Sequence, residues 1–339
     1  MPQAHFFPTG KLPLEFLQGL LQEYTGSDDR LIAGPRVGED VAVIDMGDRC
    51  MVVKTDPITF ASDQIGWYAV NVNANDVATS GARPLWMLNT VLLPEGGTTA
   101  ELVEAIFRQL RDACVQLGIT LVGGHTEVTR RLDRPIVVGV LIGEVARDKL
   151  ITTAGARVGD KVVLVKGIPI EATAIMARES ASALRERGYG EAFIKRAQNY
   201  LFEPGISIVG AARLAPDHPG VHPMHDPTEG GLATGLHELA LACGSGLRLD
   251  ADLVPVLPEG KRLCAEFGLD PLGAIASGAL VVAVDPQQMA SLMDRYRQNG
   301  IPCACVGELL PAEEGVYMVR GGRRRPLLRY DTDEITRVL

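Results

Sequence analysis

Four short stretches of the sequence place acidic residues or glycines where they could bind a cation or a phosphate. They are VGEDVAVI from Val37, VKTD from Val53, NAND from Asn73 and LVGGHTEV from Leu121. Carboxylates at several strand ends are the ligands that hydrated Mg²⁺ uses when it bridges to phosphates. Paired glycines after a strand let the backbone approach a ligand and offer its N–H groups to an anion. Together the four stretches favour a nucleotide site built from carboxylates and metal ions.

Asp76 lies in a stretch whose other residues are mostly apolar or small. Asn73 and Asp76 are three residues apart, so they share one side of the helix that the surrounding apolar spacing predicts. A carboxylate and an amide on such a helix cost free energy unless they bind a partner. The alternative is that Asp76 is solvated or caps a neighbouring element, as an isolated aspartate usually does. The other three stretches also carry residues suited to binding a cation or a phosphate. They therefore favour a ligand-binding role for Asp76 over the solvated or capping alternative.

The common phosphate-binding motifs are absent from the sequence. No G-x-x-x-x-G-K-[ST] and no G-x-G-x-x-G occurs, so neither a P-loop enzyme nor a standard dinucleotide-binding fold is indicated. The lack of G-x-S-x-G removes the usual indication of a serine hydrolase. Lys54 and Lys166, each at the end of a predicted strand, are candidates for stabilising a transferred phosphate. The alternative for both is a strand-end lysine in solvent.

Composition and charge narrow the class of protein. Of the 339 residues, 46% are hydrophobic and 22% charged, which is typical of a globular chain. No apolar run approaches the roughly 20 residues of a membrane span, and the N-terminus lacks a signal-peptide pattern. We therefore expect a cytoplasmic protein without a membrane partner. The net charge of -9 argues against a nucleic-acid partner. The basic run RGGRRR from Arg320 is interpreted as a solvated hairpin rather than a binding patch.

The six cysteines are scattered, and none forms a C-x-x-C pair, so we expect reduced thiols. Cys303 and Cys305 would point to one face of a predicted strand. They could bind a soft metal, but buried small residues are the favoured interpretation. No H-E-x-x-H occurs, so zinc is not indicated.

Helices and strands alternate along the chain, which predicts an α+β or α/β layered fold. In the first half we predict helices at 11–24, in the segment ending near Gly81 and at 100–117, with strands at 41–45, 50–56, 85–93, 119–122 and 136–145. In the second half we predict helices at 170–180, 192–201, 206–214, 232–243, 259–267 and 286–298, with strands at 161–166, 247–249, 278–284, 303–308 and 315–319. A small-residue turn at 154–160 suggests two domains, 1–155 and 156–339.

A family resemblance rests on six segments in sequence order. GEDVAVI, KTD, NANDVATSGARP, GGHTEVT, VGDKVVLVKG and HDPTEGGL resemble the aminoimidazole ribonucleotide (AIR) synthetase superfamily, whose fold is called PurM-like. The superfamily also includes selenophosphate synthetase, thiamine monophosphate kinase and the hydrogenase maturation protein HypE. NDVATSGARP followed by DPTEGGLATGLHE is most similar to the HypE branch and its AIR synthase-related relatives.

The resemblance implies a two-domain subunit whose N-terminal domain binds ATP and Mg²⁺. The N-terminal domains of two subunits would pair into a β-barrel flanked by helices, and the apolar strands of this half independently suggest a homodimer. The matched acidic magnesium positions are Asp40, Asp56, Asp76 and Asp226. The expected nucleotide contacts are Thr55, Asn73, Gly123, Gly124 and Thr126. His125 is a poor ligand for a hard cation, so we expect it, with Lys54 and Lys166, to contact phosphate or substrate.

The family implies an ATP-dependent enzyme that activates a carbonyl or amide oxygen by phosphorylation. The alternative is a nucleotide-binding partner or regulatory protein in hydrogenase or metallocofactor maturation, without turnover. In the HypE branch we expect a tail ending in a cysteine that carries a carbamoyl group. This sequence ends RYDTDEITRVL, without a thiol. We therefore expect a separate acceptor, because no other side chain in that segment is a soft, transferable nucleophile.

Overall fold

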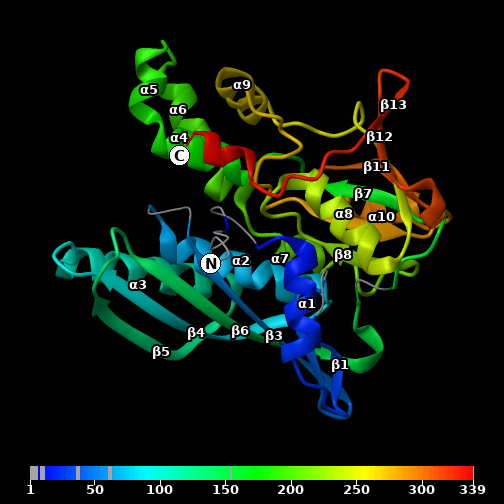
Figure 1. The fold of residues 1–339 in the computed structure, drawn as a ribbon, viewed down its shortest axis with the longest axis horizontal. Helices are drawn as coiled ribbons and strands as arrows, with labels where there is room; N and C mark the ends of the chain where they lie inside the picture. The colour runs from blue at the N-terminus through cyan, green and yellow to red at the C-terminus, as the bar shows by residue number, and fades with distance from the viewer. Residues whose placement is uncertain (1–6, 8–11, 36–38, 60–62, 153–154, 339) are drawn as a thin grey trace, which may run out of the picture.

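Two mixed β-sheets, formed one after the other along the chain, organise the structure (Figure 1). The computed structural model describes residue 7 and residues 12–35, 39–59, 63–152 and 155–338. Val37 and Gly38 of the first acidic stretch lie outside the described residues.

The first sheet has the strand order β1-β2-β3-β6-β4-β5. All neighbouring strands are antiparallel except β4 and β5, which are parallel. Its strands are β1 (Leu31–Ala33), β2 (Ala42–Asp45), β3 (Arg49–Ile58), β4 (Arg83–Pro94), β5 (Thr120–Thr129) and β6 (Ile136–Ala146).

The second sheet has the strand order β13-β12-β9-β11-β7-β10-β8 and is antiparallel except between β12 and β9. Its strands are β7 (Lys161–Val165), β8 (Val221–His225), β9 (Gly246–Asp250), β10 (Leu280–Val284), β11 (Cys303–Leu310), β12 (Val316–Arg320) and β13 (Arg323–Pro326). The two sheets thus use separate halves of the chain. The domain boundary near residue 155 stays a prediction.

Helices cover the sheets and connect them. They are α1 (Leu14–Tyr24), α2 (Ile65–Thr79), α3 (Ala100–Leu117), α4 (Glu171–Glu179), α5 (Ala181–Glu186), α6 (Glu191–Asn199), α7 (Val209–Ala212), α8 (Gly231–Cys243), α9 (Pro258–Phe267) and α10 (Met289–Gln298). The periodic helices α3, α8 and α9 begin and end within one residue of their predicted bounds. The short elements β1, β8 and α5 were not predicted, and α7 is shorter than expected. No helix of the described residues is long and apolar enough to cross a membrane.

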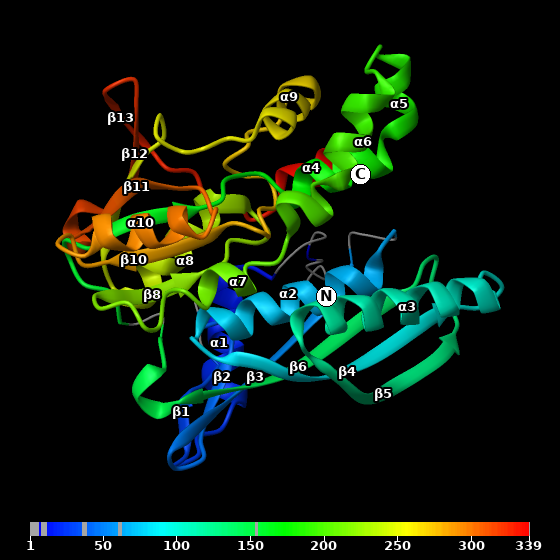
Figure 2. The ribbon, with the colours of Figure 1, turned by 180° about the vertical axis from the view of Figure 1, so that it is seen from behind.

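Helix α2 lies between the first sheet and the second half of the chain (Figures 1 and 2). Every residue of α2 except Trp67 is buried. Glycines on β6 permit its close approach, because a Cβ at Gly139 would lie 2.5 Å from Asn73 Nδ2. On the opposite side, Asn75 donates to the Ile206 carbonyl and accepts from the Ile208 N–H, both at 2.8 Å. The helix therefore joins the two halves.

Strand β5 corrects one prediction. We expected a short strand at 119–122 followed by a glycine loop, but the strand continues to Thr129 and contains both glycines. Gly124 has a positive φ of 148°, and a Cβ there would lie 1.9 Å from the Asn89 carbonyl oxygen. Close pairing with β4 therefore requires this glycine. The expectation that the paired glycines form a phosphate-binding loop after a strand end is wrong in this respect.

Two smaller predictions are confirmed. The basic run forms the exposed hairpin β12–β13, in which Gly321 and Gly322 take positive φ angles. All six cysteines are free, but Cys303 and Cys305 are half-buried rather than buried and pack against the same hydrophobic core. Among the described residues, no group of three or more His, Cys, Asp or Glu is arranged to hold a metal ion, so the soft-metal alternative gains no support.

Candidate functional site

A cavity of about 1170 Å³, which we call the central cavity, is lined by residues from both halves of the chain. Asp40 precedes β2, Asp56 lies on β3, Asp76 lies on α2 and Asp226 follows β8. All four aspartates line the central cavity, together with Lys54. The fold thus brings together the acidic residues that the sequence singled out, although they are up to 186 positions apart (226 minus 40).

Lys54 lies among these aspartates. Its Nζ is 2.8 Å from Asp76 Oδ2 and 3.2 Å from Asp56 Oδ2. Lys54 and Asp56 are two residues apart on β3, so they project from the same face of the strand. Burial works to lower the pKa of Lys54, but the attraction of Asp76, Asp56 and Asp40 outweighs it and raises the pKa well above the usual value. Lys54 is therefore a cation in this cavity, and the alternative of a solvated strand-end lysine is wrong.

Asp76 and Asp226 form the most deeply buried part of the acidic group, with relative exposures of 3% and 2%. Burial raises the pKa of both carboxyls; repulsion by Asp226 adds to the shift of Asp76, and repulsion by Asp40 adds to the shift of Asp226. Neither carboxyl oxygen of Asp226 has a hydrogen-bond partner among the described residues. Buried carboxyl oxygens without donors are costly unless a ligand satisfies them. Their chemistry fits a hard cation such as Mg²⁺.

His225 is a site residue that the sequence analysis missed. Its Nδ1 is 3.1 Å from Asp40 Oδ2 and its Nε2 is 3.3 Å from Glu238 Oε2. Burial works to lower the pKa of His225, but hydrogen bonds to Asp40 and Glu238 outweigh it and raise the pKa to about 10. A charged imidazolium therefore forms an ion pair with Asp40. The available signal was that this histidine directly precedes Asp226 at a strand end.

Asn73 is held by hydrogen bonds within the protein. It is fully buried, its Nδ2 donates to the Ala69 carbonyl at 2.8 Å and the Asp56 carbonyl at 3.4 Å, and its Oδ1 accepts from the Asp56 N–H at 2.9 Å. Both amide hydrogens are thus used within the protein. We propose that Asn73 positions Asp56 rather than binding nucleotide.

Lys166 is likewise reassigned. Its Nζ donates to the carbonyls of Pro204, Gly205 and Ser207 at 3.0, 2.8 and 2.7 Å. Burial lowers its pKa to about 8. All three ammonium hydrogens are engaged, and Lys166 does not line the central cavity. Its contacts link the end of β7 to the segment before α7, so we propose a structural role for Lys166 in place of the expected phosphate contact.

Five other predicted residues do not line the central cavity: Thr55, Gly123, Gly124, His125 and Thr126. Thr55 is exposed on the opposite face of β3 from Lys54 and Asp56. The other four lie on the exposed edge strand β5, where His125 Nε2 is 3.1 Å from Glu127 Oε2. Their assignment to nucleotide or phosphate binding stays a prediction.

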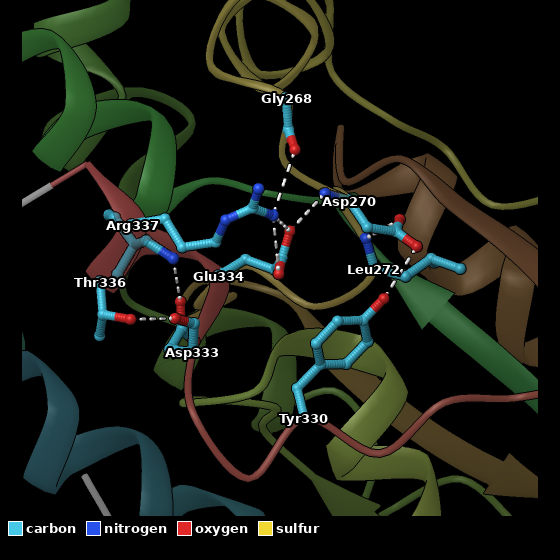
Figure 3. Close-up of polar contacts among 9 residues, drawn as sticks. Gly268, Asp270, Leu272, Tyr330, Asp333, Glu334, Thr336 and Arg337 are labelled. Carbon is cyan, nitrogen blue, oxygen red and sulfur yellow. Dashed lines mark hydrogen bonds and ion pairs between the residues drawn. The ribbon is translucent and has the colours of Figure 1, made fainter. Parts of the chain in front are cut away.

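Residues 329–333 and Thr336, in the segment 327–338, line the central cavity. Figure 3 shows polar contacts that this segment makes. Asp333, 5% exposed, accepts hydrogen bonds from the N–H groups of Gly230, Ile275 and Ile335 at 2.7, 3.2 and 2.9 Å. Tyr330 and Glu334 both bind Asp270, through its side chain and its N–H respectively, each at 2.9 Å. We call this segment the docked tail, because its polar contacts hold it against the second half.

Comparisons with known proteins agree with this architecture. The model described as "AIR synthase related protein, N-terminal domain" matches residues 38–145, and the model described as "AIR synthase related protein, C-terminal domain" matches residues 157–320. The chain therefore belongs to the AIR synthase-related family. The two-domain PurM-like fold that the six motifs suggested is confirmed.

Within this family the chain is similar to HypE proteins. It is 33% identical to the carbamoyl dehydratase HypE of Cupriavidus necator over 303 residues, which cover 84% of this chain and 80% of that protein. A solved HypE–HypF complex gives a TM-score of 0.74 at 21% identity, covering 93% of this chain and 99% of the other. A HypE structure in complex with ATP gives 0.67 at 22%, covering 95% and 92%.

Proposed function

We propose that the protein is an ATP- and Mg²⁺-dependent enzyme that phosphorylates a carbonyl or amide oxygen of a separate acceptor. The observation that carries this proposal is the convergence of the four aspartates around Lys54 in one cavity. Two relatives support it, namely a carbamoyl dehydratase and a HypE structure with bound ATP.

The acidic group supplies oxygen ligands for the metal. Mg²⁺ usually keeps several waters and binds through one or two carboxylates plus substrate phosphates. This coordination preference explains why no group of three metal-binding side chains is preformed among the described residues. Asp226, whose oxygens have no donor, and its neighbour Asp76 are the proposed primary ligands, with Asp40 and Asp56 nearby. Bound Mg²⁺ would neutralise charge on the phosphates.

Lys54 is the proposed phosphate-binding residue. Its ammonium is held as a cation by Asp76 and Asp56 and lines the same cavity. A lysine in this position can bind a phosphoryl group that carries negative charge in the transition state. Asn73 fixes the Asp56 backbone and His225 fixes the Asp40 carboxylate, so the positions of both acids are set before a ligand binds.

We further propose that the acceptor is a separate molecule. The docked tail lines the central cavity, and its anchor Asp333 is buried with three backbone donors. Leu327 and Ile335, at either end of this segment, are buried as well. The segment would have to leave all these contacts before any part of it could deliver a group to Lys54. An acceptor that diffuses into the cavity requires no such rearrangement.

The proposed assembly is a homodimer through β5. Val122 and Val128 on this edge strand are 52% and 56% exposed, and Trp86 on the adjacent β4 is 38% exposed. An exposed edge strand with apolar side chains is normally covered by another element. A second copy would cover it and place residues 123–126 at a groove between subunits, where they could contact the nucleotide.

The second candidate function is a nucleotide-binding partner protein without turnover. It is favoured by the similarity to a HypE that was solved in complex with a protein partner, HypF. Both candidates need the same Mg²⁺-ATP site. They differ only in whether ADP is formed.

One experiment separates these functions. Mg²⁺-ATP affinity is measured by calorimetry, and ADP formation is measured with a panel of carbamoyl and amide compounds. We expect ADP formation with at least one acceptor, and an affinity at least tenfold weaker in Asp76→Asn. The control Asp48→Asn changes an exposed aspartate in the β2–β3 turn and should bind like the wild type. Binding without any ADP would favour the partner protein, and unchanged affinity in Asp76→Asn would contradict both functions.

A further inference from the structure

Three arginines of the exposed hairpin β12–β13 have no ion pair with any residue that the structure describes. The hairpin projects from the second sheet on the side away from the first sheet (Figures 1 and 2). Residues 315–326 contain four arginines and no acidic residue, although the whole chain has a net charge of -9. Of the four, Arg324 pairs with Glu314 at 3.3 Å. The three without such a pair are Arg320, Arg323 and Arg325.

The three arginines lie on one face of the hairpin. The strands are antiparallel, with Arg320 directly opposite Arg323 and Met318 directly opposite Arg325. Directly opposite residues share a face, and so do residues two positions apart on one strand. Like charges directly opposite each other destabilise a strand pair. The hairpin therefore carries a repulsion that an anionic group bound to this face would relieve.

Strand β13 also offers a backbone edge. It is the last strand of the second sheet, so among the described strands only β12 pairs with it, and all four of its residues are exposed. Such an edge can accept one more strand from another chain. Arg323 and Arg325 are two positions apart, so acidic side chains at alternate positions of an added strand would lie next to them.

The alternative is that the arginines only protect an exposed edge from aggregation, as charged residues on edge strands often do. Arg323 and Arg325 fit that role. Arg320 does not, because it lies on β12, which pairs with β13 on one side and with β9 on the other. Its repulsion of Arg323 costs stability without protecting an edge. A ligand that neutralises all three charges accounts for the arrangement.

We propose that the β12–β13 hairpin is a docking surface for an extended acidic segment of a partner protein. The segment pairs with β13 as an added strand, and its carboxylates bind Arg320, Arg323 and Arg325. A nucleic acid is a poorer occupant, because it makes no use of a strand edge and the net charge of -9 repels a long polyanion. The three arginines do not line the central cavity, so the inference does not depend on the proposed function.

Fluorescence anisotropy at low ionic strength tests the proposal with the full chain and four labelled probes. The first probe is an octapeptide that alternates glutamate and threonine, and in the second lysine replaces glutamate. In the third, proline replaces threonine, which keeps the charge but prevents strand pairing. The fourth is a thymidine octanucleotide. We expect the first probe to bind at least about tenfold more tightly than each of the others. Equal binding of the proline peptide, or tighter binding of the oligonucleotide, would overturn the proposal.

Two double variants test the arginines themselves. Arg323→Gln with Arg325→Gln should bind the glutamate–threonine peptide at least about tenfold more weakly than the wild type, because both charges beside the added strand are lost. The matched control, Arg108→Gln with Arg213→Gln, removes the same charge from two exposed positions elsewhere and should bind within about threefold of the wild type. Equal affinities of the two double variants would mean that binding follows net charge alone, and the docking surface would be wrong.

Arg323→Glu separates binding from folding. It places an opposite charge across from Arg320, so the Tm should rise at low ionic strength while the glutamate–threonine peptide no longer binds. A lower Tm would make Arg323 a stabilising residue and contradict the proposal. Light scattering of the Arg323→Gln and Arg325→Gln double variant completes the test. Aggregation of this variant, together with no peptide binding by the wild type, would assign the arginines to edge protection instead.

Discussion

Lys54 places a positive charge between Asp56 and Asp76. Removing one partner of a buried charge group leaves the others uncompensated and costs about 3–5 kcal/mol. We therefore expect Lys54→Met to lower the free energy of unfolding by roughly that amount. If the aspartates are Mg²⁺ ligands, the metal should restore part of the loss, so Mg²⁺ should raise the Tm of the variant more than that of the wild type.

Urea unfolding with and without Mg²⁺ measures both effects. Lys161→Met is the matched control, because Lys161 also lies on a strand, as the first residue of β7, and pairs with a carboxylate, Glu308, at 3.0 Å, but outside the central cavity. It should lose less stability and gain nothing from Mg²⁺. If Mg²⁺ stabilised the two variants equally, the aspartates around Lys54 would not be ligands of Mg²⁺.

Glu171 predicts a pH dependence of stability. The unfolded chain releases this proton near pH 4.5 and the folded protein near pH 8, because burial raises the folded pKa. Between these values the folded state binds more protons, so this group makes the wild type less stable as the pH rises. Glu171→Gln lacks the titration. Its stability advantage over the wild type, measured by urea unfolding, should grow by at least about 1 kcal/mol between about pH 5 and about pH 8. If the difference in unfolding free energy between Glu171→Gln and the wild type did not change with pH, Glu171 would not be a buried group with a raised pKa.

The sequence could predict part of this site for a physical reason. Asp56 and Asp76 stand out because each carboxylate interrupts an apolar strand or a small-residue helix, where an unpaired charge is costly. Glu171 shows the same signal in IPIEATAIMA but was not singled out. The pairing of His225 with Glu238 could not be predicted, because it depends on how β8 and α8 pack. The roles of Asn73 and Lys166 likewise depend on backbone groups that only the fold brings near.

At the scale of elements, the docked tail depends on one carboxylate. Asp333 Oδ2 accepts from the Gly230 N–H, while Oδ1 accepts from Ile275 and Ile335. In Asp333→Asn one of these oxygens becomes an N–H donor that faces another donor, which costs about 1–3 kcal/mol. We expect faster amide hydrogen exchange across residues 327–338, with little change in β7 or β10. Asp331→Asn, at an exposed position of the same segment, is the control. Unchanged exchange would show that Asp333 does not anchor the tail.

Strand β5 shows why some elements escape prediction from sequence. Paired glycines usually end a strand, and Gly123 and Gly124 were interpreted in that way. In the fold the strand continues through them, because pairing with β4 supplies the hydrogen bonds and the close approach of Asn89 excludes any side chain at Gly124. The periodic helix α3 has no such dependence on a neighbour. Its amphipathic pattern and the C-terminal Gly118, with φ of 68°, are local signals, and its bounds were predicted correctly.

At the scale of the whole molecule, the two halves meet at α2. The helix carries Asp76 toward the central cavity and Asn75 toward the segment 206–208 of the second half. Two residues one position apart on α2 thus connect the proposed nucleotide site with the contact between the two halves of the chain. A movement of one half against the other would displace Asp76 from Asp226, so the geometry of the proposed metal site depends on this contact.

The exposed face of β5 gives the last prediction, a homodimer in solution. Light scattering at micromolar concentration should give about twice the 36.3 kDa of one chain. The double variant Val122→Glu and Val128→Glu places charges on this apolar edge and should yield a folded monomer. Val158→Glu, at an exposed valine outside β5, is the control and should stay dimeric.

The same double variant tests whether the dimer completes the site. If residues 123–126 contact the nucleotide across the subunit boundary, the monomer should keep the four aspartates but lose at least tenfold in Mg²⁺-ATP affinity. A wild-type mass near 36.3 kDa would contradict the dimer. A monomeric double variant with wild-type affinity would show that the central cavity of one chain binds nucleotide without a second subunit. The prediction that Gly123, Gly124, His125 and Thr126 contact the nucleotide would then be wrong.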